Sequence, residues 1–227
     1  MLFRTFLFDL DGTLLDHFEA IHRCHTQTMT HFGLPPPSLI DVRNAIGGGI
    51  EQAIAKLFGP QHAALVVEAT AYYRSCFPQH LLVGLKLMPG ALELIRALNA
   101  QGATCAVFTN KHGPSAREVC DHLGVTPLVR GIFGAMDTPW LKPQPEFADH
   151  VLRALGAKAE GTMLVGDSPW DVDAAHNAGF PCWVVTTGTH TAEELRVHGA
   201  DRIFPGLPEV HRALFGHSTG TMPLKSN

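Results

Sequence analysis

Residues 6–15 read FLFDLDGTLL, an apolar run that ends in two acids, Asp9 and Asp11, with one residue between them. The run has the composition of a buried strand over residues 5–10. Burying acids is costly unless a cation or hydrogen bonds compensate them, and a strand end followed by glycine is where an open α/β sheet places its ligand site. The pattern indicates a hard divalent metal such as Mg²⁺, with one acid free to attack and the other to move protons. An ordinary β-turn is the alternative for this stretch alone, since Asp and Gly are frequent in turns.

The composition limits the class of protein. The chain has 227 residues, of which 45% are apolar, enough for a sizeable core or for one domain with a smaller insertion. Its net charge of −4, without a basic run, argues against nucleic acid and anionic membranes as partners. No apolar stretch approaches the ~20 residues of a membrane span, and the N-terminus lacks the pattern of a signal peptide.

The cysteines and histidines do not form an evident metal site. The five cysteines show no CxxC motif and no zinc spacing, so we expect reduced, buried thiols in a cytoplasmic protein. His22 and His25 lie three residues apart on an expected helix, a spacing that allows metal ligation. No carboxylate at a suitable spacing supports such a site, and we interpret both as solvated or hydrogen-bonded histidines.

Short apolar runs alternate with amphipathic segments through most of the chain. This alternation predicts βαβ units and a parallel, Rossmann-like α/β sheet with helices on both faces. Helix-stopping glycines follow several of the amphipathic segments. The expected strands are residues 5–10, 103–109, 131–133, 162–166, 182–186 and 202–204, and the expected helices between them are 91–99, 114–123, 145–155, 170–178 and 192–197.

Residues 16–85 depart from this alternation because they show helical periodicity throughout. The block is too long for a simple crossover between two strands, so we predict an inserted helical domain and a discontinuous α/β core of residues 1–15 and 86–215. Residues 216–227 are polar, without periodicity, and we expect a flexible tail. Proline and glycine clusters separate the expected helices of the insertion, which are 18–32, 39–46, 50–58 and 63–77.

Further polar residues follow the other expected strands. Thr109 and Asn110 end the second strand, Lys142 lies in a loop before a helix, and Asp167 and Asp171 follow the run TMLVG. Each has an ordinary alternative: a helix cap, a solvated surface charge, or acids favoured by a helix N-terminus. In a parallel sheet, however, these strand ends meet at one edge.

The combined set matches the needs of phosphoryl transfer through an aspartyl-phosphate. A carboxylate attacks phosphorus in line, a metal neutralises charge, and donors hold the equatorial oxygens. Four such groups of polar residues occur in this order, each at a strand end or a helix-entry loop. Helix capping alone does not explain all four.

The four motifs resemble those of the haloacid dehalogenase superfamily, in family order and over about residues 3–215. Within the superfamily, the sequence of the chain is most similar to phosphoglycolate phosphatases and their close relatives. The helical block resembles the family's type-1 cap domain. The motifs are Asp9-x-Asp11-Gly12-Thr13, Thr109-Asn110, Lys142-Pro143 and Gly166-Asp167-x-x-x-Asp171.

The resemblance implies a role for each acid. Asp9 would be the nucleophile, and Asp11 would protonate the leaving alcohol and then deprotonate the hydrolytic water. Mg²⁺ would be held by Asp9, the backbone carbonyl of Asp11 and Asp167, with Asp171 supporting that shell. Dehalogenases of the superfamily lack an acid at the position of Asp11, so the acid found here indicates phosphate chemistry.

The resemblance also implies the phosphate-binding groups. Thr109 and the Asn110 backbone would bind phosphoryl oxygens together with Gly12, and Lys142 would offset the charge on Asp9 and the phosphate. In the expected cap, Gly47-Gly48-Gly49 corresponds to a substrate-specificity loop in which Gly48 would approach the ligand, and a plain helix-breaking linker is the alternative. Arg43 could reach a substrate carboxylate or sugar hydroxyl, or be a surface residue of its helix.

The leading prediction is a Mg²⁺-dependent phosphatase of a small phosphomonoester, such as phosphoglycolate, a sugar phosphate or a nucleotide. Within the same fold, a phosphomutase of the β-phosphoglucomutase type is the alternative. A non-enzymatic alternative is a phospho-aspartate switch resembling response-regulator receivers, although these are about half as long and accept phosphate on a later strand. We expect a monomer or a homodimer.

Overall fold

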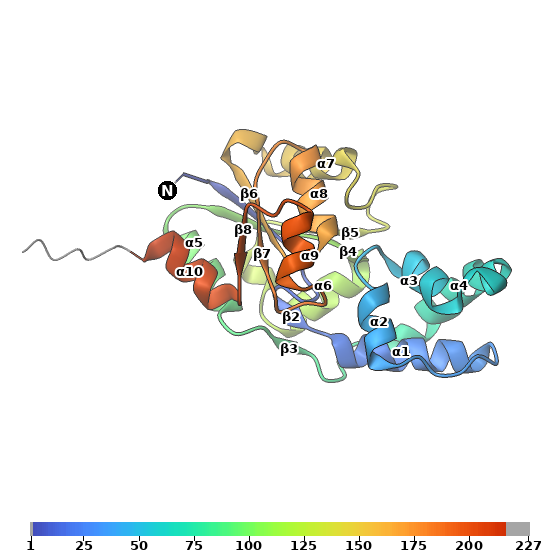
Figure 1. Cartoon of the computed structure of the whole chain (residues 1–227). Coiled ribbons are helices and arrows are strands. Elements are labelled where there is room, and N and C mark those ends of the chain that lie inside the picture. Colours follow the sequence, from blue (N-terminus) through green and yellow to red (C-terminus); the bar gives the residue numbers. More distant parts are fainter. Residues whose placement is uncertain (1, 217–227) are drawn as a thin grey trace, which may run out of the picture.

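The computed structural model describes residues 2–216, and its centre is a six-stranded parallel sheet with strand order β5-β4-β1-β6-β7-β8 (Figure 1). The first strand of the chain is therefore in the middle of the sheet, between β4 and β6. This confirms the predicted α/β class. The strands are β1 Thr5–Phe8, β4 Thr104–His112, β5 Ile132–Ala135, β6 Thr162–Gly166, β7 Cys182–Val185 and β8 Arg202–Phe204.

Side chains alternate along each strand and form a separate apolar core on each face of the sheet. On β1, Phe6 and Phe8 are buried in one core and Leu7 in the other. Helices α5 (Ala91–Ala100), α6 (Gly113–His122) and α10 (Leu207–Phe215) contribute to the first core. The second core receives α7 (Pro145–Leu155), α8 (Pro169–Asn177) and α9 (Ala192–Val197).

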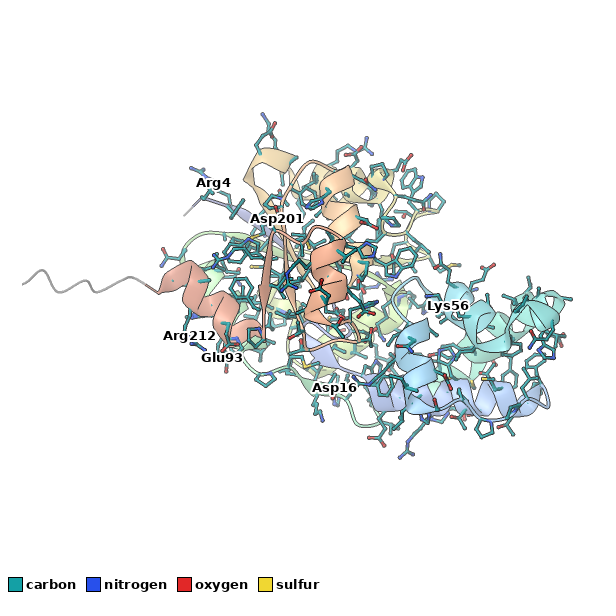
Figure 2. All side chains as sticks on the ribbon, in the orientation of Figure 1. Arg4, Asp16, Lys56, Glu93, Asp201 and Arg212 are labelled. Carbon is teal, nitrogen blue, oxygen red and sulfur yellow. The ribbon has the colours of Figure 1, made fainter. Side chains whose placement is uncertain are left out.

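The helices of residues 18–76 lie together beside the sheet, drawn in blue to cyan in Figure 1. Where the chain leaves the sheet region and returns to it, β2 (Leu15–Asp16) pairs antiparallel with β3 (Lys86–Leu87). Asp16, labelled in Figure 2, lies on this two-stranded connection before the first helix. The four helices are α1 Phe18–His31, α2 Leu39–Ala45, α3 Ile50–Phe58 and α4 Val66–Cys76.

Two expected element bounds were wrong, and one helix was missed. The helix expected over 63–77 begins only at Val66, because residues 60–65 form a 3₁₀ turn after Gly59 in which His62 has non-helical angles. Strand β4 continues past Thr109 to His112, which pairs with Ala135 beyond an irregularity in register. Helix α10 was not predicted; it is nine residues long, and few of them are buried.

The expectation for the cysteines agrees with the structure, whereas the expectation for the tail is almost wholly untested. All five cysteines are buried and free, as expected. Except for Gly216, the predicted tail 216–227 lies outside the described residues. Over residues 2–216, no helix is both long and apolar enough to cross a membrane.

Phe147 tests the packing of the second core. Its fully buried ring on α7 packs against Phe108 of β4, with 4.7 Å between ring centroids. Phe147→Ala removes this contact and leaves a cavity, so the free energy of unfolding should fall by about 3–5 kcal/mol in urea denaturation. Val197→Ala, at a side chain that is 77% exposed, should stay within about 0.5 kcal/mol of wild type. A loss below about 1 kcal/mol at Phe147 would contradict this packing.

Candidate active site

The predicted site residues meet at the carboxyl edge of the sheet. Asp9 directly follows β1 and Asp167 directly follows β6, while Thr109 and Asn110 belong to the end of β4. Because β1 lies between β4 and β6, these three strand ends are neighbours. The loop between β5 and α7 adds Lys142.

Lys142 is the buried cation around which the acids gather. Its Nζ is 2.7 Å from Asp9 Oδ1 and 2.6 Å from Asp171 Oδ1, and the residue is only 3% exposed. Burial by itself would lower the pKa of Lys142, but the charges of Asp171 and Asp9 outweigh burial and raise that pKa. Lys142 is therefore charged and holds both acids in place.

Both carboxylate oxygens of Asp171 have partners within the protein. One carboxylate oxygen binds Lys142, and the other accepts hydrogen bonds from the backbone N–H of Asp167 (3.2 Å) and from the backbone N–H and hydroxyl of Ser168 (3.0 and 2.6 Å). These bonds form a capping box at the start of α8. Asp171 thus fixes the turn that carries Asp167.

Asp9 and Asp167 are less completely neutralised. Thr13 donates a hydrogen bond of 2.8 Å to Asp167 Oδ1. Burial, opposed by Lys142, raises the pKa of Asp9 to about 6, and burial together with the charges of Asp9 and Asp171 raises the pKa of Asp167 well above its usual value. Oxygens of Asp9, Asp167 and Asp171 lie within 4.8 Å of one another. Three acids around one lysine leave an excess of negative charge, which fits a hard divalent cation.

Two glycines allow the backbone to lie against Asp167. Gly12 has φ of +90°, and a Cβ there would be 2.6 Å from Asp167 Oδ2; a Cβ on Gly188 would clash with the same oxygen. Thr187 holds this arrangement by donating a hydrogen bond of 2.6 Å to the Gly12 carbonyl. Sequence reasoning missed Thr187 and Gly188, although a glycine shortly after a strand was the signal used for the first motif.

Asp11 belongs to a second charged group, on the side of the helices. Its carboxylate oxygens are 2.9 and 3.1 Å from Lys111 Nζ, and His17 Nδ1 is 3.5 Å away. Burial raises the pKa of Asp11, but the charge of Lys111 and the proximity of His17 outweigh burial and hold that pKa below its usual range. In this structure Asp11 is therefore ionised.

His17 links this group to the far end of the helical segment. Its Nε2 donates to the Leu81 carbonyl, so in the neutral ring Nδ1 is free to accept from Lys111 Nζ at 2.9 Å. Sequence reasoning missed His17, because its partner carbonyl is 64 residues away in the chain.

Asn110 fastens two loops to the end of β4. Its Oδ1 accepts from the Lys142 backbone N–H (2.8 Å), and its Nδ2 donates to the carbonyls of Lys142 (3.1 Å) and Gly47 (3.2 Å). Thr109 Oγ1 accepts from the Lys111 backbone N–H at 3.2 Å. The loop of Gly47–Gly49 is thereby held next to the acids.

A pocket of about 1120 Å³, including the part open to solvent, lies between this sheet edge and the helices α1–α4. Gly48 and Asp171 are not among the residues that line it; Gly48 is buried against Trp170, and its neighbours Gly47 and Gly49 reach the pocket. Arg43 places its guanidinium 4.6 Å above the ring of Phe18. The predicted site residues that line the pocket are Asp9, Asp11, Gly12, Arg43, Thr109, Asn110, Lys142 and Asp167.

The chain belongs to the haloacid dehalogenase-like hydrolases, whose sequence model matches residues 6–185. It is 30% identical over 211 residues to a 5'-nucleotidase of Pseudomonas aeruginosa, covering 93% of this chain and 95% of the relative. It is 30% identical over 206 residues to a phosphoglycolate phosphatase of Rhodospirillum rubrum, covering 87% and 85%.

The fold agrees with this assignment. The crystal structure of a predicted phosphoglycolate phosphatase from Haemophilus somnus superposes with a TM-score of 0.84 at 25% identity, covering 94% of this chain and 99% of that one. The resemblance to the superfamily is thus confirmed, and a non-enzymatic receiver does not account for a chain of this family.

Gly48 tests the contact between the loop of Gly47–Gly49 and helix α8. A Cβ there would be 2.8 Å from a ring carbon of Trp170 and would also displace the flexible end of Gln52, so Gly48→Ala should lower the free energy of unfolding by about 1–3 kcal/mol through overpacking. Gly161→Ala is the matched control, because a Cβ there meets nothing within 4 Å. Both variants lose similar backbone freedom in the unfolded chain, so the difference between them in urea denaturation reports the overpacking, and Gly48→Ala in a Gln52→Ala background isolates the part due to Trp170. Equal stabilities would contradict it.

Proposed function

We propose that this hydrolase is a Mg²⁺-dependent phosphatase that hydrolyses a small phosphomonoester through a phosphoryl group carried on Asp9. The observation that carries the proposal is the position of Asp9. It is held by buried Lys142 beside Asp167, and it lines the same pocket as Asp11. Relatives named for phosphoglycolate phosphatase and 5'-nucleotidase support the phosphomonoester as the substrate class.

The first half of the reaction transfers the phosphoryl group to the protein. A carboxylate oxygen of Asp9 attacks phosphorus, the bond to the substrate oxygen breaks, and Asp11 donates a proton to that oxygen. The Thr109 hydroxyl, the Asn110 backbone N–H and the nearby Gly12 hold the phosphoryl oxygens, while Lys142 offsets their charge. Asp11 must be neutral for this step, whereas Lys111 holds it ionised in the structure described here.

The second half returns the protein to its starting state. Asp11, now ionised, takes a proton from water, the water oxygen attacks phosphorus, and the bond to Asp9 breaks to release inorganic phosphate. The ionised form, which the pairing with Lys111 favours, suits this step.

Mg²⁺ fits beside these groups. The carboxylates of Asp9 and Asp167 and the backbone carbonyl of Asp11 would hold it, with Asp171 fixing the backbone N–H of Asp167. When bound, it would neutralise the negative charge of the phosphate and the acids. Both oxygens of Asp171 already accept hydrogen bonds from protein groups, which suits it to supporting the metal site rather than to direct ligation.

We further propose that residues 16–85 act as a cap over a core of residues 1–15 and 86–215. The paired strands β2 and β3 connect the two parts, and the Gly47 loop reaches the core through Asn110. A cap that closes over the pocket would exclude bulk water while the phosphoryl group is transferred.

Phosphate release from a panel of phosphomonoesters tests the function directly. We expect turnover with Mg²⁺, none with EDTA, and a loss of at least about a thousandfold in Asp9→Asn, because the amide is a poor nucleophile. Asp121→Asn, at an exposed acid on α6, should keep wild-type rates. No turnover by folded protein with Mg²⁺ on any ester would contradict the proposal, and turnover that needs a sugar bisphosphate activator would favour the mutase alternative.

Asp11→Asn tests the proton transfer to the leaving group. Alkyl phosphates need a proton on the departing oxygen, so their kcat should fall by about 10²–10⁴-fold. With 4-nitrophenyl phosphate, whose leaving group departs as a stable anion, the loss should be markedly smaller when phosphoryl transfer to Asp9 is measured in the pre-steady-state burst. An equal loss for both esters in that phase would exclude Asp11 as the acid.

A further inference from the structure

The wall that residues 16–85 contribute to the pocket includes three helical segments. Helix α1 presents Phe18, Ile21 and His25, whose spacing of three and four residues places them on one face. The same wall includes apolar and aromatic side chains of α3 and of the end of α4, and these are Ile50, Ala53, Tyr73 and Phe77. The pocket thus continues from Asp11 into an apolar chamber.

His25 is an unexplained polar group in this chamber. It is only 2% exposed, and neither ring nitrogen has a hydrogen-bond partner anywhere in residues 2–216. Its ring packs against Tyr73, with 4.5 Å between centroids. The expectation of a solvated or hydrogen-bonded histidine is confirmed for His22, which bonds the Pro37 carbonyl, whereas His25 has no partner within the described protein and lines the pocket. Such a polar group needs a hydrogen-bond partner from the pocket contents, either water or a ligand.

The protonation state of His25 limits what it can bind. Burial lowers its pKa to about 3, so the ring is neutral near pH 7 and offers one N–H donor and one nitrogen acceptor. It is therefore suited to a neutral polar atom and offers no charge to a carboxylate.

The two lysines of the pocket are paired with acids: Lys142 with Asp9 and Asp171, and Lys111 with Asp11. Arg43 also lines the pocket and has no acidic partner among residues 2–216; its guanidinium stacks on Phe18. Phe18 lies seven residues before His25 on α1, about two helical turns, so this charge is presented at the Phe18 end of the chamber. A small anionic leaving group such as glycolate would meet no such charge beside His25.

We propose that the chamber binds the alcohol part of the substrate as a heteroaromatic ring, as in a nucleoside monophosphate, with a ring heteroatom hydrogen-bonded to His25. The inference rests on the phosphatase function proposed above and specifies its substrate class. His25 lies eight residues beyond His17, the N-cap residue of α1, which corresponds to a rise of about 12 Å along the helix axis. Because His17 lies beside Asp11, a substrate that also reaches His25 needs the length of a nucleoside rather than the two carbons of glycolate.

The substrate panel provides the first test. The value of kcat/KM should be highest for a nucleoside 5'-monophosphate, lower for phenyl phosphate, which has a ring without heteroatoms, and at least about tenfold lower for phosphoglycolate. Phosphoglycolate as the best substrate would overturn the inference and leave the phosphatase function intact. Absence of turnover on every ester would overturn the phosphatase function itself.

Variants at His25 provide the second test. In His25→Leu, the ratio of kcat/KM for the nucleotide to that for phenyl phosphate should fall about tenfold, mainly through KM, and His25→Gln should restore part of it. His22→Leu is the matched control on the same helix and should keep the wild-type ratio. Nucleotide binding to Asp9→Asn with and without His25→Leu, measured by calorimetry, gives a readout without turnover and should weaken about tenfold. An unchanged ratio and unchanged binding in His25→Leu would overturn the role of His25.

Discussion

The ammonium group of Lys142 lies between two buried carboxylates, and the rest of the site depends on this contact. Its bonds of 2.7 and 2.6 Å to Asp9 and Asp171 join the end of β1 to the start of α8 through a loop that comes from β5. Removing one partner of such a buried pair typically costs about 3–5 kcal/mol, since a charge is left uncompensated. The same contact that stabilises this corner of the fold therefore holds Asp9 at the pocket.

The site divides into two charged groups with different tasks. Around Lys142, the acids outnumber the cation, which leaves Asp9 and Asp167 able to take a further positive charge. In the second group, the charge of the single acid Asp11 is balanced by Lys111. His17 connects Lys111 to the Leu81 carbonyl at the far end of the helical segment. A movement of the helices that displaces His17 would therefore change the charged surroundings of Asp11.

Part of this arrangement could be predicted from the sequence, because it follows from local patterns. A buried strand ending in acids is visible in residues 6–11 and again around Asp167, and parallel pairing brings such ends together. The links made by His17 and Asn110 could not be predicted, since their partners are distant in the chain and backbone carbonyls leave no mark in the sequence. His25 could not be singled out from the sequence for the same reason, because its burial without a hydrogen-bond partner arises only when the helices pack together.

The central claim is that Asp9 carries the phosphoryl group during turnover. Borohydride reduces an acyl phosphate to an alcohol, so enzyme reacting with substrate and then quenched with borohydride should contain homoserine in place of Asp9. Peptide mass spectrometry would locate the change. The account predicts this conversion at Asp9 alone, dependent on both substrate and Mg²⁺. Rapid turnover without any conversion at Asp9, or conversion at another carboxylate, would contradict it.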